Sequence, residues 1–185
     1  MSKVLVVVDA QNDFITGTLA NPAAVEALPF VQTLITKAIN DSEPIVWTQD
    51  THSDNYLETQ EGRNLPIVHC IRDTWGWDIA AKVFYRNYEH GRYLQKNSFG
   101  AEPINWMELC HDIEVERNER IEQIDICGFV SSICVVSNAM ILKALYPETP
   151  IVFHAYASAG LTPEDHEAAC KVMECCQIKV IREAI

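Results

Sequence analysis

The feature that most constrains this chain is a strand–turn–helix pattern around Cys134. The apolar run Ile124 to Cys127 predicts a buried strand, and the stretch GFVSSICVVSNAMILKAL, from Gly128 to Leu145, leads through a turn into a helix. Because backbone N–H groups and the helix dipole favour a thiolate at a helix start, they lower the pKa of a cysteine there. Cys134 is therefore a candidate nucleophile, although a buried core cysteine is an equal alternative on local grounds.

The other elements alternate along the chain. Further strands are predicted from apolar runs, and helices from apolar spacing or capping residues. Pro29 predicts a kink or a split in the first long helix. The predicted strands are Lys3 to Val8, Pro44 to Asp50, Tyr93 to Gln95, Ile124 to Cys127, Pro150 to Ser158 and Gln177 to Ile181. The predicted helices are Pro22 to Asn40, Gly76 to Asn87, Trp106 to Leu109, the one after Cys134, and one capped by Thr162 with Ala168, Ala169, Val172, Met173 and Cys176 on its apolar face. Residues 112–122 are read as a charged surface connection.

This alternation predicts an α/β fold. A doubly wound, six-stranded parallel sheet with helices on both faces gives three layers, and the length and composition suit one domain spanning residues 1–185. The carboxyl ends of parallel strands meet at one edge of such a sheet, where these folds bind ligands. We therefore expect a site at that edge.

Polar side chains end three of the predicted strands. They are Asp9, Asp50 and Lys96, and the turn at Cys134 follows a fourth strand. Taken singly, Asp9 could be a turn or cap residue, and Lys96 could be a solvated charge. Their convergence on one edge favours a shared site, where a lysine would stabilise a thiolate and developing negative charge.

A long polar loop, Thr51 to Cys70, follows the second strand. Long loops without regular structure usually serve a site. Asp50, His52 and His69 form a ligand set suited to Zn²⁺, with Fe²⁺ or Mn²⁺ also possible. The alternative is a hydrogen-bonded loop with two unrelated histidines.

Composition excludes several classes of partner. The formal net charge of −12 argues against nucleic acid and anionic membrane surfaces, and no apolar run is long enough to span a bilayer. The first residues carry no small-residue cleavage site, so we expect no signal peptide. The seven cysteines show no paired framework, which favours reduced thiols and a cytoplasmic location. The vicinal Cys175 and Cys176 are interpreted as packing residues rather than as a redox device.

Ordered motifs along nearly the whole chain resemble the isochorismatase-like cysteine hydrolase superfamily, which includes nicotinamidases. The motifs are VVVDAQNDF, TQDTH, LPIVHC, QKNSFGA and GFVSSICVVSNA. The resemblance implies a six-stranded parallel sheet and a catalytic triad of Asp9, Lys96 and Cys134. It implies that Asp50, His52 and His69 hold the metal, with no organic cofactor. It also implies a cis peptide between Phe129 and Val130, and an oxyanion hole formed by the N–H groups of Val130 and Cys134.

The resemblance further implies a small-molecule substrate and a homodimer or homotetramer. The expected reaction is cleavage of a small carboxamide through a thioester on Cys134. Alternatives are an isochorismatase-type or other small-molecule hydrolase, and a non-catalytic binding module.

Two positions depart from the nicotinamidase pattern. Leu65 stands where nicotinamidases usually have a tryptophan that stacks on the substrate ring, and Phe14 could still supply an aromatic wall. The further metal-ligand position in the loop offers Ser53, Asp54 or Glu58, of which Glu58 is best placed by count.

Overall fold

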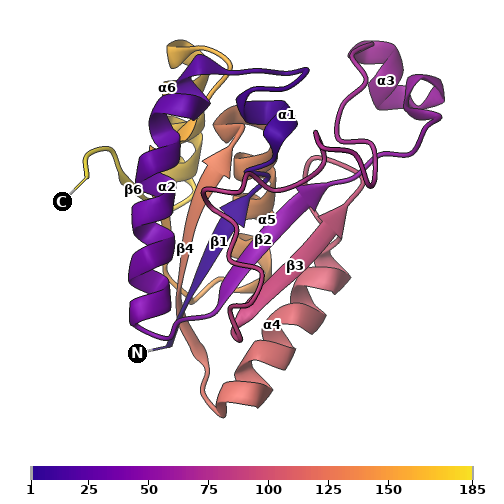
Figure 1. Cartoon of the computed structure of the whole chain (residues 1–185). Helices are drawn as coiled ribbons and strands as arrows, with labels where there is room; N and C mark the ends of the chain where they lie inside the picture. The colour runs from indigo at the N-terminus through magenta and orange to yellow at the C-terminus, as the bar shows by residue number, and fades with distance from the viewer. Residues whose placement is uncertain (1, 185) are drawn as a thin grey trace.

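A computed structural model describes residues 2–184 and shows a six-stranded, all-parallel sheet in the order β3-β2-β1-β4-β5-β6 (Figure 1). The fold expected from the sequence is confirmed. β1 and β4 lie side by side at the centre, where the strand order reverses direction. The strands are β1 (Ser2–Val8), β2 (Ile45–Asp50), β3 (Gly91–Lys96), β4 (Ile121–Phe129), β5 (Ile151–Ala159) and β6 (Lys179–Ile181).

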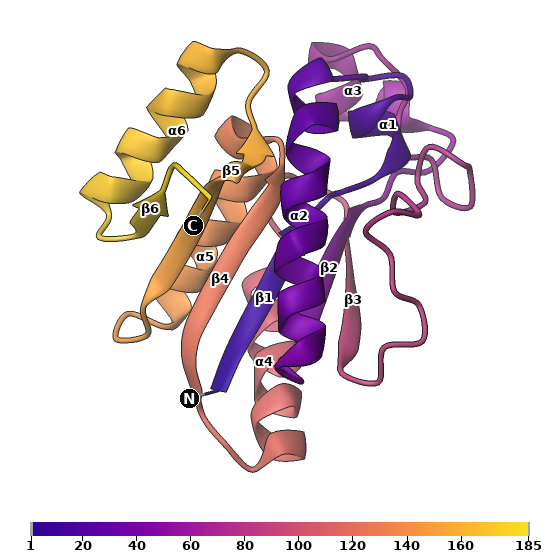
Figure 2. The same ribbon diagram turned by 60° about the vertical axis from the view of Figure 1, so that its left-hand side comes forward.

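Helices cover both faces of this sheet (Figures 1 and 2). Alternate residues of a strand point to opposite faces, so Val4, Val6 and Val8 of β1 pack into one core while Leu5 and Val7 pack into the other. Helices α4 (Pro103–Arg117), α5 (Val136–Leu145) and α6 (Pro163–Cys175) cover the first face, and α2 (Pro22–Asn40) covers the second. The short helix α1 (Asn12–Ile15) follows β1.

α2 begins and ends where the sequence predicts. Asn21 caps it by accepting a hydrogen bond from the N–H of Ala23. The expected split at Pro29 is wrong, because the helix is continuous across it. Pro29 lies on the exposed side, while Leu28 and Val31 are buried against the sheet, so core packing holds both halves in one helix.

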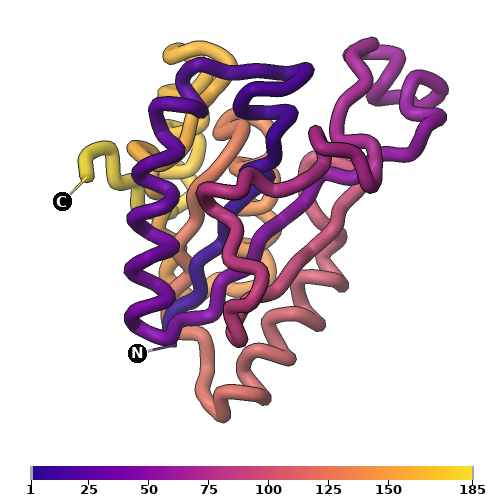
Figure 3. The backbone as a smooth tube through the Cα atoms, in the orientation of Figure 1, coloured from indigo at the N-terminus to yellow at the C-terminus, as the bar shows by residue number. Residues whose placement is uncertain are grey.

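The helix predicted over Gly76 to Asn87 is absent. Ile79 and Val83 are buried as expected, but they belong to an irregular segment that also lies on the second face, and Figure 3 traces it without helical coils. Backbone hydrogen bonds to the segment after β1 take the place of helical ones. The N–H of Ala80 donates to the carbonyl of Ala10 at 2.8 Å, and the backbone carbonyl of Asp78 accepts from the N–H of Asn12 at 3.0 Å.

Three further differences concern local structure. α4 runs through most of the segment read as a surface connection. The polar loop after β2 contains a 3₁₀ turn, η1 (Tyr56–Glu58), and a short helix, α3 (Gln60–Asn64). On α6 the buried residues are Ala169, Cys170 and Met173, whereas Ala168, Val172, Cys175 and Cys176 are exposed, so the packing role given to the vicinal cysteines is wrong.

None of the helices within residues 2–184 combines the length and apolar character needed to span a membrane.

Candidate active site

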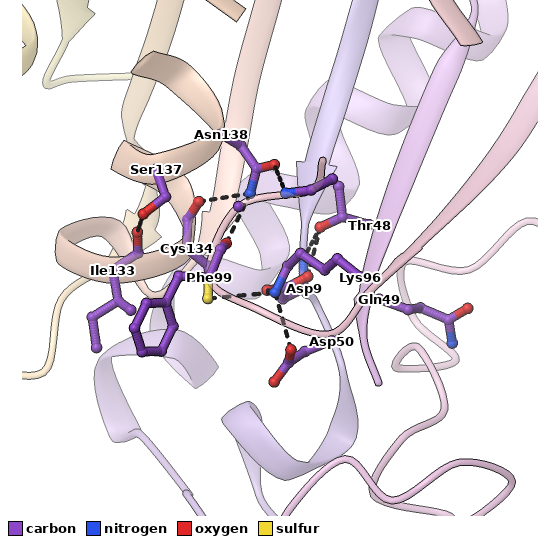
Figure 4. A network of polar contacts seen from close by, with 12 residues as sticks. Asp9, Thr48, Gln49, Asp50, Lys96, Phe99, Ile133, Cys134, Ser137 and Asn138 are labelled. Atoms are coloured by element: carbon purple, nitrogen blue, oxygen red, sulfur yellow. Dashed lines mark hydrogen bonds and ion pairs between the residues drawn. The ribbon is translucent and has the colours of Figure 1, made fainter. Parts of the chain in front are cut away.

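The strand ends bring the predicted residues together at the carboxyl edge of the sheet. The ammonium group of Lys96, at the end of β3, lies 2.7 Å from Asp9 Oδ2 and 3.2 Å from Asp50 Oδ1. The same Nζ lies 3.6 Å from Cys134 Sγ (Figure 4). All four residues are buried. A cation, two carboxylates and a thiol therefore share one water-poor site.

Asp9 is held rigidly in the position that follows β1. The Thr48 hydroxyl donates to Asp9 Oδ1 at 2.6 Å and accepts from the Asp9 N–H at 3.1 Å. The Asp9 backbone has a φ of 45°, in the left-handed region that non-glycine residues rarely occupy. Burial raises the pKa of the Asp9 carboxyl, with the Asp50 carboxylate adding to the effect and Lys96 opposing it. A carboxylate with a raised pKa is better suited to act as a general base at neutral pH.

Cys134 lies in a π-helical turn, η2 (Ser131–Val135), that leads directly into α5. The peptide bond between Phe129 and Val130, just before this turn, is cis as the resemblance implied. Gly128 has a φ of 115°, and a Cβ there would lie 2.1 Å from the carbonyl oxygen of Val8. Only glycine allows β4 to approach β1 so closely on its way into the turn.

The pKa of the Cys134 thiol is raised, not lowered as the helix-start argument predicted. Burial is the main cause, and the carboxylates of Asp9 and Asp50 add to it, although Lys96 opposes them. A dipole at a helix start is too weak to offset full burial beside two anions. The pKa of Lys96 is raised as well, because Asp9 and the other neighbouring anions outweigh burial, so this group stays charged. In this arrangement the resting cysteine is a thiol that needs a base.

A second cluster lies beside Asp50. One ligand atom from each of Asp50, His52, Glu61 and His69 lies within 4.8 Å of the others. Asp50 Oδ2 is 2.9 Å from His52 Nε2 and 3.5 Å from His69 Nε2, while Glu61 Oε1 is 3.7 Å and 3.9 Å from the same two nitrogens. His69 Nδ1 is hydrogen-bonded to the carbonyl of Ile67 at 2.7 Å, which leaves Nε2 directed at the cluster. Two imidazoles and two carboxylates are a donor set that fits a divalent metal such as zinc.

Glu61, not Glu58, is the fourth member of this cluster. Ser53, Asp54 and Glu58 are all exposed. The hydroxyl of Thr59 caps α3 by accepting from the N–H of Gly62 at 2.9 Å, which places Glu61 in the first helical turn. Counting residues from His52 along the loop could not identify Glu61, because the loop contains a short helix. Thr59, a typical helix-capping residue two positions before Glu61, is a sequence signal for that helix.

Two buried side chains after β1 hold the segments that carry Asp50 and His69 in place. Gln11 accepts from the N–H of Asp50 at 2.8 Å and donates to its carbonyl at 2.9 Å. The Asp13 carboxylate accepts from the N–H of Cys70 at 2.8 Å, next to His69. The polar residues of VVVDAQNDF therefore fix parts of the chain that are distant in sequence.

A pocket of about 440 Å³ opens above Cys134. Both predicted substrate-binding residues, Phe14 and Leu65, line it, together with Val130 and the cluster residues Asp50, Glu61 and His69. Other lining residues were not predicted from the sequence: Thr18, Leu19, Ala20, Phe99, Ile133 and Leu161. Phe99 and Ile133 lie within quoted motifs, but nothing in the sequence marked them as lining residues, and the other four lie outside the motifs.

Comparisons of the sequence with known proteins find a matching family and a curated relative. Residues 3–184 match the family model described as the isochorismatase domain. A nicotinamidase from Saccharomyces cerevisiae is 31% identical over 187 residues, covering 81% of this chain and 85% of that protein.

Solved structures show the same fold. A nicotinamidase/pyrazinamidase from Bacillus subtilis has a TM-score of 0.85 and 24% identity, covering 98% of this chain and 100% of that one. A pyrazinamidase from Pyrococcus horikoshii in complex with zinc has a TM-score of 0.79 and 26% identity, covering 99% and 100%.

These similarities confirm two expectations drawn from the sequence, the family and an enzyme that hydrolyses a non-peptide C–N bond. With the family model spanning nearly every residue and a curated relative above 30% identity, the chain belongs to the isochorismatase family and is related to its nicotinamidases.

Proposed function

We propose that this protein hydrolyses nicotinamide or a similar small carboxamide through a thioester on Cys134. The observation that carries the proposal is the buried Lys96 ammonium, 2.7 Å from Asp9 and 3.6 Å from the Sγ of Cys134, which lines the pocket. The nicotinamidase and pyrazinamidase relatives support the substrate class.

The first half of the reaction forms the thioester. Asp9 accepts the thiol proton of Cys134 as sulfur attacks the amide carbon, and Lys96 stabilises the negative charge that develops on sulfur. The backbone N–H groups of Val130 and Cys134 stabilise the oxyanion of the tetrahedral intermediate. When the C–N bond breaks, Asp9 returns its proton to the nitrogen, and ammonia leaves.

The second half releases the acid. Asp9, again a carboxylate, removes a proton from a water molecule that attacks the thioester carbon. The C–S bond breaks, and Cys134 regains a proton as the carboxylic acid departs. One amide and one water thus give one acid and one ammonia.

Asp50, His52, Glu61 and His69 would hold a divalent metal, and zinc is the ion that this donor set fits best. When bound, the metal supplies Lewis acidity that orients the substrate or activates water. Asp50 also touches Lys96, so it links the metal cluster to the triad through one side chain.

Ammonia release from nicotinamide by the zinc-loaded protein tests the proposal. Cys134→Ala should abolish release and leave the unfolding curve unchanged, and acid quenching during turnover should trap an acyl adduct on Cys134 that intact-mass measurement detects. Cys170→Ala is a matched control, because Cys170 is an equally buried cysteine on α6 outside the site. Absence of release by the parent protein from nicotinamide and from other small carboxamides, or full activity of Cys134→Ala, would refute the proposal.

A homodimer or homotetramer, one domain over the whole chain and a cytoplasmic location stay predictions. All seven cysteines are free, and five of them are buried, which supports a reducing compartment. Light scattering of the purified protein would give the oligomeric state.

A further inference from the structure

The pocket above Cys134 also restricts what kind of amide can enter, if the function proposed above holds. We propose that the preferred substrate is an uncharged carboxamide with an apolar group that extends beyond one ring, and that Leu161 and Phe99 select this group.

The charges of the pocket exclude a substrate carboxylate. Among the described residues that line it, the acidic side chains are Asp50 and Glu61, and neither lysine nor arginine contributes. Lys96 is not among the residues that line this pocket, and it is already paired with Asp9 and Asp50. The two negative charges of Asp50 and Glu61 would balance the charge of a divalent ion bound in the cluster. A carboxylate on a substituent directed away from the metal cluster would therefore lose its hydration without gaining a lysine or arginine partner.

The remaining wall is apolar and larger than one ring requires. A volume of about 440 Å³ lies within the range of roughly 300–1,000 Å³ typical of pockets that enclose drug-sized molecules. A pyridine ring with its carboxamide fills only part of it. The apolar side chains around the rest are Phe14, Leu19, Leu65, Phe99, Ile133 and Leu161.

Two of these side chains lie where a substituent would cover them. Phe99 is 48% exposed and Leu161 is 63% exposed, so both line the pocket with apolar surface that is open to solvent. In the view of Figure 4, the Phe99 ring and the Asp50 carboxylate lie on opposite sides of Cys134 Sγ. A substituent directed away from the metal cluster would thus meet Phe99 and the apolar rim.

The expected gain follows from apolar burial. Each fully buried methylene contributes about 0.8 kcal/mol, which is about fourfold in kcat/KM when the contact persists in the transition state. A propyl group buried by about half should therefore raise kcat/KM by about tenfold.

Steady-state ammonia release from nicotinamide, 5-propylnicotinamide, 6-propylnicotinamide and 5-carboxynicotinamide tests the inference on the zinc-loaded protein. We expect at least one propyl compound to exceed nicotinamide by about tenfold in kcat/KM and the carboxylated compound to fall at least about tenfold below it. Leu161→Asn should reduce the propyl preference at least threefold. Val115→Asn on α4 is the matched control, because Val115 is equally exposed at 63% and lies outside the pocket, and it should leave the preference unchanged.

The outcomes separate the two proposals. Release from nicotinamide without a gain from either propyl compound would overturn this inference and leave the proposed function standing. Equal rates for the carboxylated compound and nicotinamide would overturn the charge argument, and a propyl preference that survives Leu161→Asn would overturn the role of Leu161. Failure to release ammonia from any of the four amides would overturn the proposed function itself.

Discussion

Replacing Asn138 with alanine should destabilise the protein by about 2–6 kcal/mol, because this side chain joins the turn of Cys134 to the segment after β3. Asn138 is fully buried on α5. Its Oδ1 accepts from the N–H of Ala101 and from Trp106 Nε1, each at 3.0 Å, and its Nδ2 donates to the carbonyls of Cys134 at 2.8 Å and Phe99 at 3.2 Å. Alanine leaves the two donors buried without a partner, at about 1–3 kcal/mol each.

Urea unfolding at 25 °C, followed by tryptophan fluorescence and circular dichroism, measures the loss. The slope against urea should stay constant while the midpoint falls, because the change acts on the folded state. Ser137→Ala on the same helix is the control. Its hydroxyl bonds only to the carbonyl of Ile133 from a half-buried position, so the expected loss is below about 1 kcal/mol.

The reasoning also predicts coupling between Asn138 and Trp106. Trp106→Phe removes one of the two donors, so the Asn138→Ala and Trp106→Phe losses should not add, with an interaction energy of about 1–2 kcal/mol. A loss below about 1 kcal/mol for Asn138→Ala, or strict additivity in the double variant, would refute the view that this amide holds the segment together.

Three further perturbations test other parts of the structure. Glu61→Gln should weaken zinc binding at least about tenfold in a chelator competition, and an equal effect from exposed Glu58→Gln would contradict the assignment. Burial alone would raise the pKa of Asp125, but hydrogen bonds from His154 and Gln123 outweigh burial and lower the pKa. The ionised carboxylate therefore stabilises the fold at pH values above the pKa of an unfolded aspartate, about 3.9, and this stabilisation is lost as pH falls. The difference in unfolding free energy between the parent and Asp125→Asn should therefore shrink as pH falls below about 4. Urea unfolding at pH 6 and at pH 3 measures it, and the same difference at both pH values would rule this out. Pro29→Ala restores a backbone N–H inside α2 and should raise the free energy of unfolding by about 1–2 kcal/mol, measured by thermal unfolding. A lower unfolding temperature for Pro29→Ala would show that the proline does not destabilise the helix.

The sequence predicts the sheet well, and it places Asp9, Asp50 and Lys96 at one edge as observed, because those features depend on local patterns. Apolar runs mark buried strands, and Asp9, Asp50 and Lys96 end three of them. α4 escaped prediction over much of its length because only a narrow stripe of Trp106, Cys110 and Ile113 is buried, while charged residues dominate the rest.

Features that depend on the folded environment could not be predicted in the same way. The raised pKa of Cys134 follows from complete burial beside two carboxylates, which no local pattern encodes. Glu61 joins the metal cluster only because α3 packs closely on η1, where a Cβ on Gly62 would lie 2.1 Å from the carbonyl oxygen of Tyr56.

The left-handed backbone of Asp9 and the buried charges around it also bear on how this chain would evolve in the laboratory. A buried ion cluster is often less stable than apolar residues of similar volume, and glycine would relieve the backbone at position 9. Combined substitutions that replace the whole cluster by apolar residues are thus expected to stabilise the fold, whereas removing one member alone leaves a buried charge unpaired and destabilises it. A library of this protein selected for thermal resistance alone should drift toward inactive variants, so any search for robust ones must score turnover in the same round.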